Sequence, residues 1–360
     1  MSMRRVVILG STGSIGTTCL NYLRNNNPGF VVVGLTAHKN IAKLSLLGNE
    51  FNCPTLITDP IENSGLEDFF ESTRPDIVLN AIAGADGLFA TVTAIKCGID
   101  SALSNKESVV MGGTWIFKEA MKRNVKIIPV DSEHSAIYNL LKGHKASSLV
   151  ITASGGPFVD RMDLENVTVE EALNHPTWKM GKKITIDSST LANKGLEVIE
   201  ASFLFDFKPE DIEVTVHRQS VVHSMVRTQE GAVYAQMSPP DMTLPIISAL
   251  SDEKLQLRNV VSPLSFSNLN LTFEKPDTLR FPLLSLAYKA LEIDGSATIA
   301  YNAADEVAVN AFMEGLIPYS RISEIVKTTI EDPTFKEKVS NYEETMEKDR
   351  SARIIARKAL

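Results

Sequence analysis

The sequence of 360 residues predicts an α/β protein with three successive parts: a doubly wound parallel sheet, an α+β region and a C-terminal helical region. Three observations lead to this fold class. Apolar runs that alternate with helical stretches dominate the first third of the chain, as in a parallel sheet. Strand-like runs without long helices between them follow at residues 213–237, which indicates antiparallel pairing. Near the end, Ala304, Val307, Ala308, Ala311 and Phe312 form a one-faced helical stripe.

Composition and charge limit the possible partners. Hydrophobic residues make up 44% of the chain and charged residues 22%, which are values of a globular protein with a sizeable core. The formal net charge of −8 disfavours a nucleic-acid partner, and no apolar run is long enough to span a bilayer, so we also expect no membrane partner. The scattered cysteines Cys19, Cys53 and Cys97 indicate a reducing compartment. We therefore predict a cytoplasmic protein.

A glycine-rich loop follows the first strand-like run, residues 5–9. Residues 10–16 read Gly-Ser-Thr-Gly-Ser-Ile-Gly and lead into a predicted helix. Such a loop lets the backbone approach a pyrophosphate, whose charge the amides at the helix start then face. The G-x-x-G-x-x-G spacing is a weak signal alone, and a glycine turn without a ligand is the alternative. We predict a Rossmann-like dinucleotide-binding domain over residues 1–130, with cofactor contacts at Gly10, Ser11, Thr12, Gly13, Ser14 and Ile15.

The end of the second predicted strand, residues 30–35, indicates which dinucleotide binds. An NAD-binding fold usually has an acidic residue there for the ribose hydroxyls. Here the sequence continues Thr36-Ala37-His38-Lys39-Asn40, with no acid and one certain cation. A 2′-phosphate would be favoured at such a position, so the pattern predicts NADP(H) rather than NAD(H). Alternatively, Lys39 is an ordinary surface lysine.

Lys106 is the next candidate, because it follows a predicted strand at residues 101–103. Ligands of parallel sheets bind at the carboxyl ends of the strands. An ammonium group at that edge could therefore reach an anionic substrate or cofactor. A surface residue at a helix start is the alternative interpretation.

Three carboxylates form a candidate metal site. Asp131 and Glu133 follow the strand-like run 125–130, and at strand spacing they would point to the same side. Like charges held together call for a cation or a shared proton, although a solvated turn is the alternative. Glu197, in the first turn of a helix predicted over 196–205, could be a third ligand or could only complement the helix dipole. Three carboxylate ligands favour Mg²⁺ or Mn²⁺ over Zn²⁺.

A second set of polar residues is suited to a phosphate group. Ser154 precedes two glycines, so a hydroxyl and free amides come together, although a tight turn explains the pattern equally. Ser188, Asn193 and Lys194 supply a hydroxyl, an amide and an ammonium. Trp178 lies in a loop bracketed by Pro and Gly, which indicates a lid over the site or a core plug under a long loop.

Together these motifs resemble the 1-deoxy-D-xylulose-5-phosphate reductoisomerase family from residue 10 to about residue 312. Each motif is weak alone, but their order along the chain leaves little room for coincidence. The motifs that carry the resemblance are residues 9–16, 105–108, 129–134, 154–158, 175–181, 193–197, 220–225 and 240–242.

The resemblance implies roles for individual residues. Asp131, Glu133 and Glu197 would hold the metal and act in catalysis, together with Lys106 at the hydroxyl end of the substrate. The implied substrate contacts are Ser132, Glu133, Ser154, His175, Trp178, Ser188, Asn193, Lys194 and Glu197. Beyond the glycine-rich loop, the implied cofactor contacts are Lys39, Asn40, Asn105, Glu107, Met180, Gly181 and Met242.

The implied activity is the NADPH- and Mg²⁺- or Mn²⁺-dependent conversion of 1-deoxy-D-xylulose 5-phosphate to 2-C-methyl-D-erythritol 4-phosphate in non-mevalonate isoprenoid precursor biosynthesis, by a homodimer. On this basis we expect a catalytic domain over residues 131–252, a linker over 253–277 and a helical bundle over 278–360. Another NADP-dependent aldehyde or semialdehyde reductase would share the first domain but not need three carboxylates. A non-catalytic NADPH-binding sensor would need neither the carboxylates nor the phosphate set.

Overall fold

The computed structural model describes residues 3–26, 29–251 and 257–360, so residues 253–256 of the predicted linker lie outside the described part. The chain divides into two compact units. The first unit comprises residues 1–108, 116–138 and 241–263, and the second comprises residues 109–115, 139–240 and 264–360. Among the described residues, no helix is both long and apolar enough to cross a membrane.

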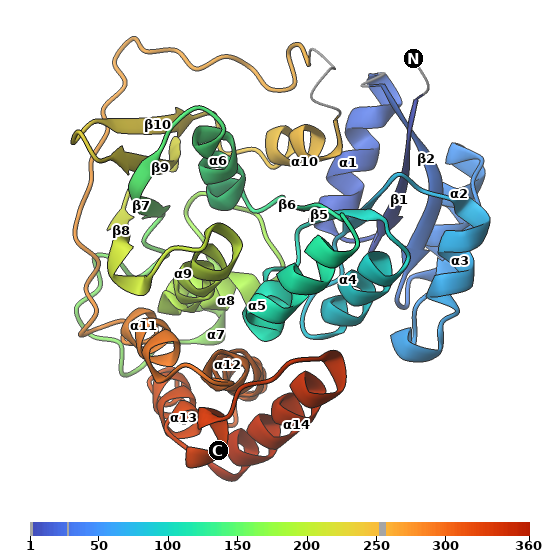
Figure 1. Cartoon of the computed structure of the whole chain (residues 1–360). Coiled ribbons are helices and arrows are strands. Elements are labelled where there is room, and N and C mark those ends of the chain that lie inside the picture. Colours follow the sequence, from blue (N-terminus) through green and yellow to red (C-terminus); the bar gives the residue numbers. More distant parts are fainter. Residues whose placement is uncertain (1–2, 27–28, 252–256) are drawn as a thin grey trace. The chain divides into compact units, whose positions relative to one another are not determined.

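Strands and helices alternate along the first unit, as the sequence predicts (Figure 1). The first unit also contains one helix from much later in the chain, formed by residues after 240. Two helices, the fifth and sixth, also include residues of the second unit. The elements are β1 (Arg4–Leu9), α1 (Ser14–Asn25), β2 (Phe30–Ala37), α2 (Ile41–Phe51), β3 (Thr55–Ile57), η1 (Ile61–Asn63), α3 (Leu66–Thr73), β4 (Ile77–Asn80), α4 (Asp86–Lys96), β5 (Asp100–Leu103), α5 (Lys106–Lys122), β6 (Ile127–Pro129), α6 (Ser132–Leu141) and α10 (Thr243–Leu250).

The six strands form one fully parallel sheet in the order β3-β2-β1-β4-β5-β6. This is the order of a doubly wound dinucleotide-binding sheet, and the predicted fold class is confirmed. Alternate residues of β1 face opposite sides because successive side chains of a strand do. Val6 and Ile8 belong to a core with α1, α2 and α10, whereas Val7 and Leu9 belong to a core with α3 and α4. Helices thus cover both faces of the sheet, so a ligand can bind only at the edge formed by the carboxyl ends of the strands.

The second unit combines a sheet with a helical region (Figure 1). One strand, β7, precedes three helices, and three more strands follow them. Its elements are β7 (Ala146–Ala153), α7 (Val169–Leu173), α8 (Lys182–Thr190), α9 (Ala192–Phe205), η2 (Pro209–Asp211), β8 (Ile212–Val216), β9 (Val222–Thr228), β10 (Val233–Met237), α11 (Leu283–Ile293), α12 (Ala297–Met313), α13 (Arg321–Ile330), η3 (Pro333–Lys336) and α14 (Tyr342–Lys358).

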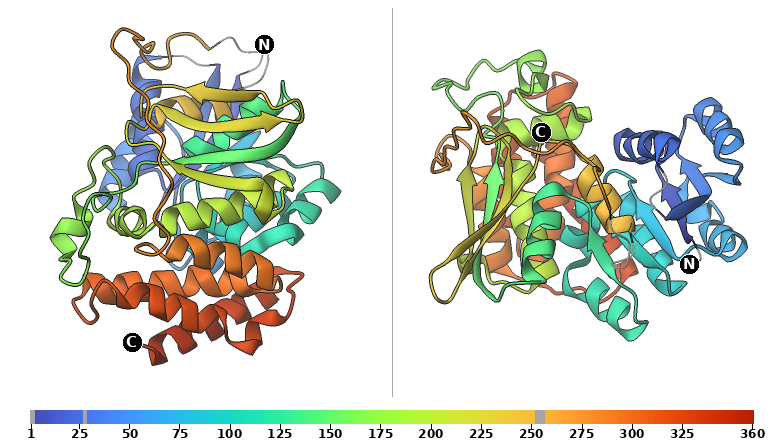
Figure 2. Two further views of the ribbon diagram at one scale, coloured as in Figure 1. Left: turned by 90° about the vertical axis from the view of Figure 1, so that its left-hand side faces the viewer. Right: turned by 90° about the horizontal axis from the view of Figure 1, so that it is seen from above.

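The four strands of this unit lie side by side in the order β10-β9-β7-β8 (Figure 2). The pair β10–β9 is antiparallel, as expected, whereas β8 and β9 do not pair, because β7 lies between them and is antiparallel to β9. The pair β7–β8 is parallel because α8 and α9 intervene between the two strands and carry the chain back across the sheet. The sheet is therefore mixed rather than purely antiparallel.

The C-terminal region is helical, as predicted, and α12 is its central helix. The predicted stripe residues, from Ala304 to Phe312, are all buried. The one-faced description is wrong, however, because Ile299, Asn302 and Val309, on the opposite side of the helix, are buried as well. Helices α8, α11, α13 and α14 all pack against α12 and leave it little exposed surface. A helix surrounded by others carries no clear polar face.

Candidate active site

The glycine-rich loop joins β1 to α1 at the carboxyl edge of the parallel sheet. Gly10 has φ +74°, and a Cβ atom there would lie 2.6 Å from the carbonyl oxygen of Ala81. Only glycine combines this left-handed conformation with such a close approach. The amide and hydroxyl of Ser11 both donate to the carbonyl oxygen of Thr36, each at 2.8 Å, and tie the loop to the end of β2. The loop is thus shaped as a dinucleotide-binding turn requires.

The residues that follow β2 lie beside this loop. The Asn40 side chain caps α2 by accepting a hydrogen bond from the amide of Lys43 at 3.2 Å. Lys39 is exposed, in keeping with either interpretation of it. One acid was missed by sequence reasoning, because it follows β3 rather than β2. This acid is Asp59, whose Oδ2 atom lies 3.5 Å from Nε2 of His38.

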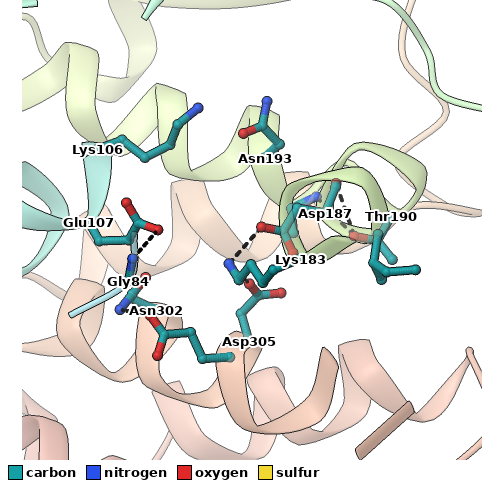
Figure 3. A network of polar contacts seen from close by, with 12 residues as sticks. Gly84, Lys106, Glu107, Lys183, Asp187, Thr190, Asn193, Asn302 and Asp305 are labelled. Carbon is teal, nitrogen blue, oxygen red and sulfur yellow. Dashed lines mark hydrogen bonds and ion pairs between the residues drawn. The ribbon is translucent and has the colours of Figure 1, made fainter. Parts of the chain in front are cut away.

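Asn105 and Glu107 organise the loop that follows β4. The Asn105 side chain caps α5 by accepting from the amide of Ser108 at 2.8 Å, and its Nδ2 donates to the carbonyl oxygens of Ile82 and Gly84 at 2.8 and 2.9 Å. Oε1 of Glu107 accepts from the amide of Gly84 at 3.2 Å (Figure 3). Both side chains therefore position backbone at the carboxyl edge of the sheet, where a cofactor of this fold binds.

Lys106 and Asp131 form an ion pair within the first unit. The Nζ atom of Lys106 lies 2.5 Å from Oδ2 of Asp131, and the two side chains are only 8% and 12% exposed. Burial acts to raise the pKa of Asp131, but the charge of Lys106 and the nearby His134 hold that pKa well below its usual range. Asp131 is therefore ionised at neutral pH and able to bind a cation. Lys106 is a buried residue, so the surface alternative is wrong.

Strand spacing does not align Asp131 with Glu133. Strand β6 ends at Pro129 and α6 begins at Ser132, so Glu133 lies in the first turn of a helix. Ser132 donates a hydrogen bond from its hydroxyl to Oε2 of Glu133 at 2.5 Å. Strand spacing is the wrong explanation because a helix starts directly after the short strand, and an acid in its first turn favours that start. The two acids nevertheless converge as expected, because a carboxylate oxygen of Asp131 and one of Glu133 lie within 4.8 Å of each other.

In the second unit, His175 joins the two serines predicted to bind phosphate. Its Nε2 atom lies 3.1 Å from Oγ of Ser154 and 3.1 Å from Oγ of Ser188. The amides of Thr177 and Trp178 donate to its Nδ1 atom at 3.1 and 2.8 Å, which leaves the ring proton on Nε2. Burial lowers the pKa of His175, so the ring is neutral at pH 7. Two hydroxyls and one imidazole N–H thus converge on one place.

Helix α9 carries the remaining predicted phosphate ligands. It begins at Ala192, four residues earlier than expected. Glu197 therefore lies in the second turn and not in the first, where an acid would complement the helix dipole. Nδ2 of Asn193 donates to Oε1 of Glu197 at 2.6 Å, and Lys194 contacts the other oxygen of that carboxylate. A Cβ atom on Gly195 would lie 2.5 Å from the hydroxyl of Tyr301. This glycine therefore lets α9 pack closely against α11 and α12.

A buried ion cluster next to Ser188 was not foreseen. The Nζ atom of Lys183 lies 2.6 Å from Oδ2 of Asp187 and 2.6 Å from Oδ2 of Asp305 (Figure 3). The two carboxylates are 3% and 0% exposed. The cluster links α8, which carries Ser188, to α12. The spacing of Lys183 and Asp187, four residues apart, was the available signal for a helix here.

The lid residues and the predicted nicotinamide neighbours lie in both units. Trp178 and Met180 are half-buried in the loop before α8, and Gly181 caps that helix. Met242 is the residue before α10 in the first unit. The core-plug alternative for Trp178 does not hold, because the side chain is only partly buried.

The parallel sheet with its glycine-rich loop, and the polar groups of the second unit, define a dinucleotide-dependent oxidoreductase. Sequence models of 1-deoxy-D-xylulose 5-phosphate reductoisomerase match residues 6–60 and 57–113, and models of the C-terminal domains of that enzyme match residues 127–205 and 237–355. The chain belongs to the 1-deoxy-D-xylulose 5-phosphate reductoisomerase family.

Full-length relatives agree with this assignment. A 1-deoxy-D-xylulose 5-phosphate reductoisomerase of Treponema denticola is 44% identical over 371 residues, which cover 99% of this chain and 97% of that protein. The enzyme of Thermodesulfovibrio yellowstonii is 44% identical over 382 residues, which cover 99% of this chain and 100% of that protein.

Solved structures give the same result. A DOX-P reductoisomerase crystallised with NADPH, fosmidomycin and magnesium superimposes with a TM-score of 0.91 at 36% identity, covering 99% of this chain and 98% of that one. The reductoisomerase of Zymomonas mobilis, in complex with NADPH, has a TM-score of 0.87 at 35% identity and covers 98% of each chain. The predicted family and fold are both confirmed.

Proposed function

We propose that the chain converts 1-deoxy-D-xylulose 5-phosphate to 2-C-methyl-D-erythritol 4-phosphate with NADPH and a divalent metal ion. The observation that carries this proposal is the convergence of Ser154 and Ser188 on His175, in a chain of the reductoisomerase family. Such a hydroxyl and imidazole set suits a phosphate group, which a simple aldehyde reductase would not need.

The phosphate of the substrate would bind to Ser154, Ser188, Asn193 and Lys194, with His175 beside them. The Lys194 ammonium supplies the charge, and the hydroxyls and imidazole supply directed donors. The phosphate is remote from the carbons that react. Its binding energy is thus available to close the Trp178 loop and to orient the sugar, which raises turnover rather than affinity alone.

By the family resemblance, the ligands of one divalent cation would be Asp131, Glu133 and Glu197. The donor chemistry fits, because three carboxylates suit the hard ions Mg²⁺ and Mn²⁺. The depressed pKa of Asp131 keeps one ligand ionised before a metal arrives. When bound, the ion supplies Lewis-acid polarisation of the substrate oxygens. Lys106 and Ser132 would then contact the hydroxyl end of the sugar.

NADPH would bind along the carboxyl edge of the parallel sheet. The glycine-rich loop from Gly10 to Ile15 would hold the pyrophosphate, and Lys39 with Asn40 the adenosine half. The remaining contacts, on the nicotinamide side of the cofactor, would come from Asn105, Glu107, Met180, Gly181 and Met242. The cofactor supplies the hydride that reduces the rearranged, branched aldehyde, and the closed loop excludes water during the rearrangement.

One assay tests the proposal. Purified protein, 1-deoxy-D-xylulose 5-phosphate and NADPH are combined with Mg²⁺ or with EDTA, and absorbance is followed at 340 nm. We expect NADPH oxidation only with the metal present. An aldehyde or semialdehyde reductase would keep its activity in EDTA, and a cofactor sensor would oxidise no NADPH in either mixture.

Two further predictions accompany this function. A homodimer is implied by the family resemblance, and light scattering of the purified protein tests it. A cytoplasmic location is consistent with the three unpaired cysteines, which occur more often in reducing compartments.

A further inference from the structure

Lys43, a residue that the sequence did not single out, reaches from α2 back to the glycine-rich loop. Its Nζ atom donates to the carbonyl oxygen of Thr12 at 2.9 Å and to Oγ1 of Thr17 at 3.0 Å. Its backbone amide is held by the Asn40 cap. The ammonium group is therefore fixed at the point where the glycine-rich loop, the first turn of α1 and the end of β2 meet.

This point has a defined role in a sheet of this topology. The ribose of the adenosine half binds at the end of the second strand, and the pyrophosphate binds at the glycine-rich loop. The bonds of Ser11 to Thr36 hold those two segments together. A 2′-phosphate on that ribose would carry its charge into the region where Lys43 lies.

An acidic residue near the end of β2 makes the position of the Lys43 ammonium relevant to the choice between NADPH and NADH. Asp59, which follows β3, faces His38 at 3.5 Å, and both side chains are about half exposed. A carboxylate close to the ribose would by itself favour unphosphorylated hydroxyls over a phosphate. The fixed charge of Lys43, on the loop side, opposes that effect.

We propose that Lys43 is a specificity-determining residue that binds the 2′-phosphomonoester of the adenosine half of NADPH and selects it over NADH. The inference rests on the proposed NADPH dependence. Of the three N–H groups of Lys43, one donates to the loop and one to the first turn of α1, so within the described residues one remains for a phosphate oxygen. A merely structural Lys43 would instead hold the glycine-rich loop in shape for any adenine nucleotide.

Two small ligands separate these roles, because 2′,5′-ADP and 5′-AMP differ only in the 2′-phosphate. Their dissociation constants are measured by calorimetry for the full-length protein and for Lys43→Met, Lys43→Arg and Lys122→Met. Lys122 serves as the control because its side chain is 69% exposed on α5. For Lys43→Met we expect a loss of about tenfold or more for 2′,5′-ADP. The dissociation constant of Lys43→Met for 5′-AMP should change by less than about twofold. The dissociation constants of Lys122→Met for both ligands should also change by less than about twofold.

Lys43→Arg should keep most of the preference, because it keeps the charge. Equal losses for both ligands in Lys43→Met would assign the residue to loop shape alone and overturn the proposal, as would no loss for either. Retained binding of 5′-AMP shows that the variant is folded. If the unaltered protein did not bind 2′,5′-ADP more tightly than 5′-AMP, the proposed NADPH dependence itself would fail.

Discussion

Lys106 holds its ammonium 2.5 Å from Oδ2 of Asp131, although we assign one residue to the substrate and the other to the metal. A cation that binds Asp131 must share this carboxylate with Lys106 or displace it. The positive charge of Lys106 therefore replaces part of the charge of a metal ion, and it keeps the buried Asp131 ionised. Metal binding would release Lys106 toward the substrate.

Replacing Lys106 by Met should separate metal binding from turnover. Removing the competing ammonium leaves the Mn²⁺ affinity of the variant unchanged or higher, since like charges nearby disfavour a cation. Turnover of 1-deoxy-D-xylulose 5-phosphate should nevertheless fall by about 100-fold or more, as expected for a lost charged contact in the transition state. Mn²⁺ titration by electron paramagnetic resonance and steady-state kinetics give the two values. Unchanged turnover would remove Lys106 from the substrate site.

Lys194 should matter only for substrates that carry a phosphate. Lys194→Gln should raise KM for 1-deoxy-D-xylulose 5-phosphate by about 10- to 100-fold, because a charge-assisted contact is lost. NADPH binding should not change. The exposed Lys208, whose side chain is 77% accessible, provides the control variant Lys208→Gln. Steady-state kinetics check both variants, and an unchanged KM in Lys194→Gln would contradict the phosphate assignment.

His175 should make stability depend on pH. Its pKa in the folded protein is lowered by burial, so the unfolded chain binds more protons between that lowered value and the ordinary value of about 6.5. The contribution of neutral His175 to the free energy of unfolding is therefore fully present above about pH 6.5, and it is lost as the pH falls through this window. A His175→Gln variant lacks this contribution.

Urea unfolding at several values between about pH 5 and 8 measures the effect. The unaltered protein should lose more stability on acidification than His175→Gln does. Buried His223, whose pKa burial also lowers, is present in both proteins and cancels in the comparison. Identical pH profiles for the two proteins would show that His175 is not held neutral.

The Lys183 cluster should contribute to stability and to the position of Ser188. Lys183→Met leaves the buried carboxylates of Asp187 and Asp305 without their shared cation, which costs about 3–5 kcal/mol. The control is Lys338→Met, because the Lys338–Asp294 pair is 74% and 64% exposed and contributes less than about 1 kcal/mol. Urea unfolding measures both, and equal small losses would contradict this account of the cluster.

The parallel sheet could be predicted because its signals are local. Buried apolar runs such as 5–9, and the glycine-rich loop between a strand and a helix, need no knowledge of distant contacts. Strand β3 has only three residues with no buried side chain, and it was missed for that reason. Helix α8 gave a weak signal because its Ile184-Thr185-Ile186 run favours a strand, whereas the ion pair of Lys183 with Asp305 of α12 supports the helix.

The candidate site could be predicted as a set of residues but not as an arrangement. The two serines and His175 were named from their motifs, whereas their convergence on one nitrogen atom depends on tertiary packing. Lys43 and Asp59 were missed because they approach the glycine-rich loop and the end of β2 from other elements. Such contacts have no signature in sequence spacing.

Direct Mn²⁺ binding tests the proposed metal site at Asp131, Glu133 and Glu197 without relying on turnover. Electron paramagnetic resonance titrations of the unaltered protein, Asp131→Asn, Glu133→Gln and Glu197→Gln would count tight sites and give their affinities. We predict one tight site in the unaltered protein and at least a tenfold weaker one in each variant, as about 1.4 kcal/mol per lost ligand would give. Wild-type Mn²⁺ affinity in Glu197→Gln would show that Glu197 is not a metal ligand, and would contradict the proposed site.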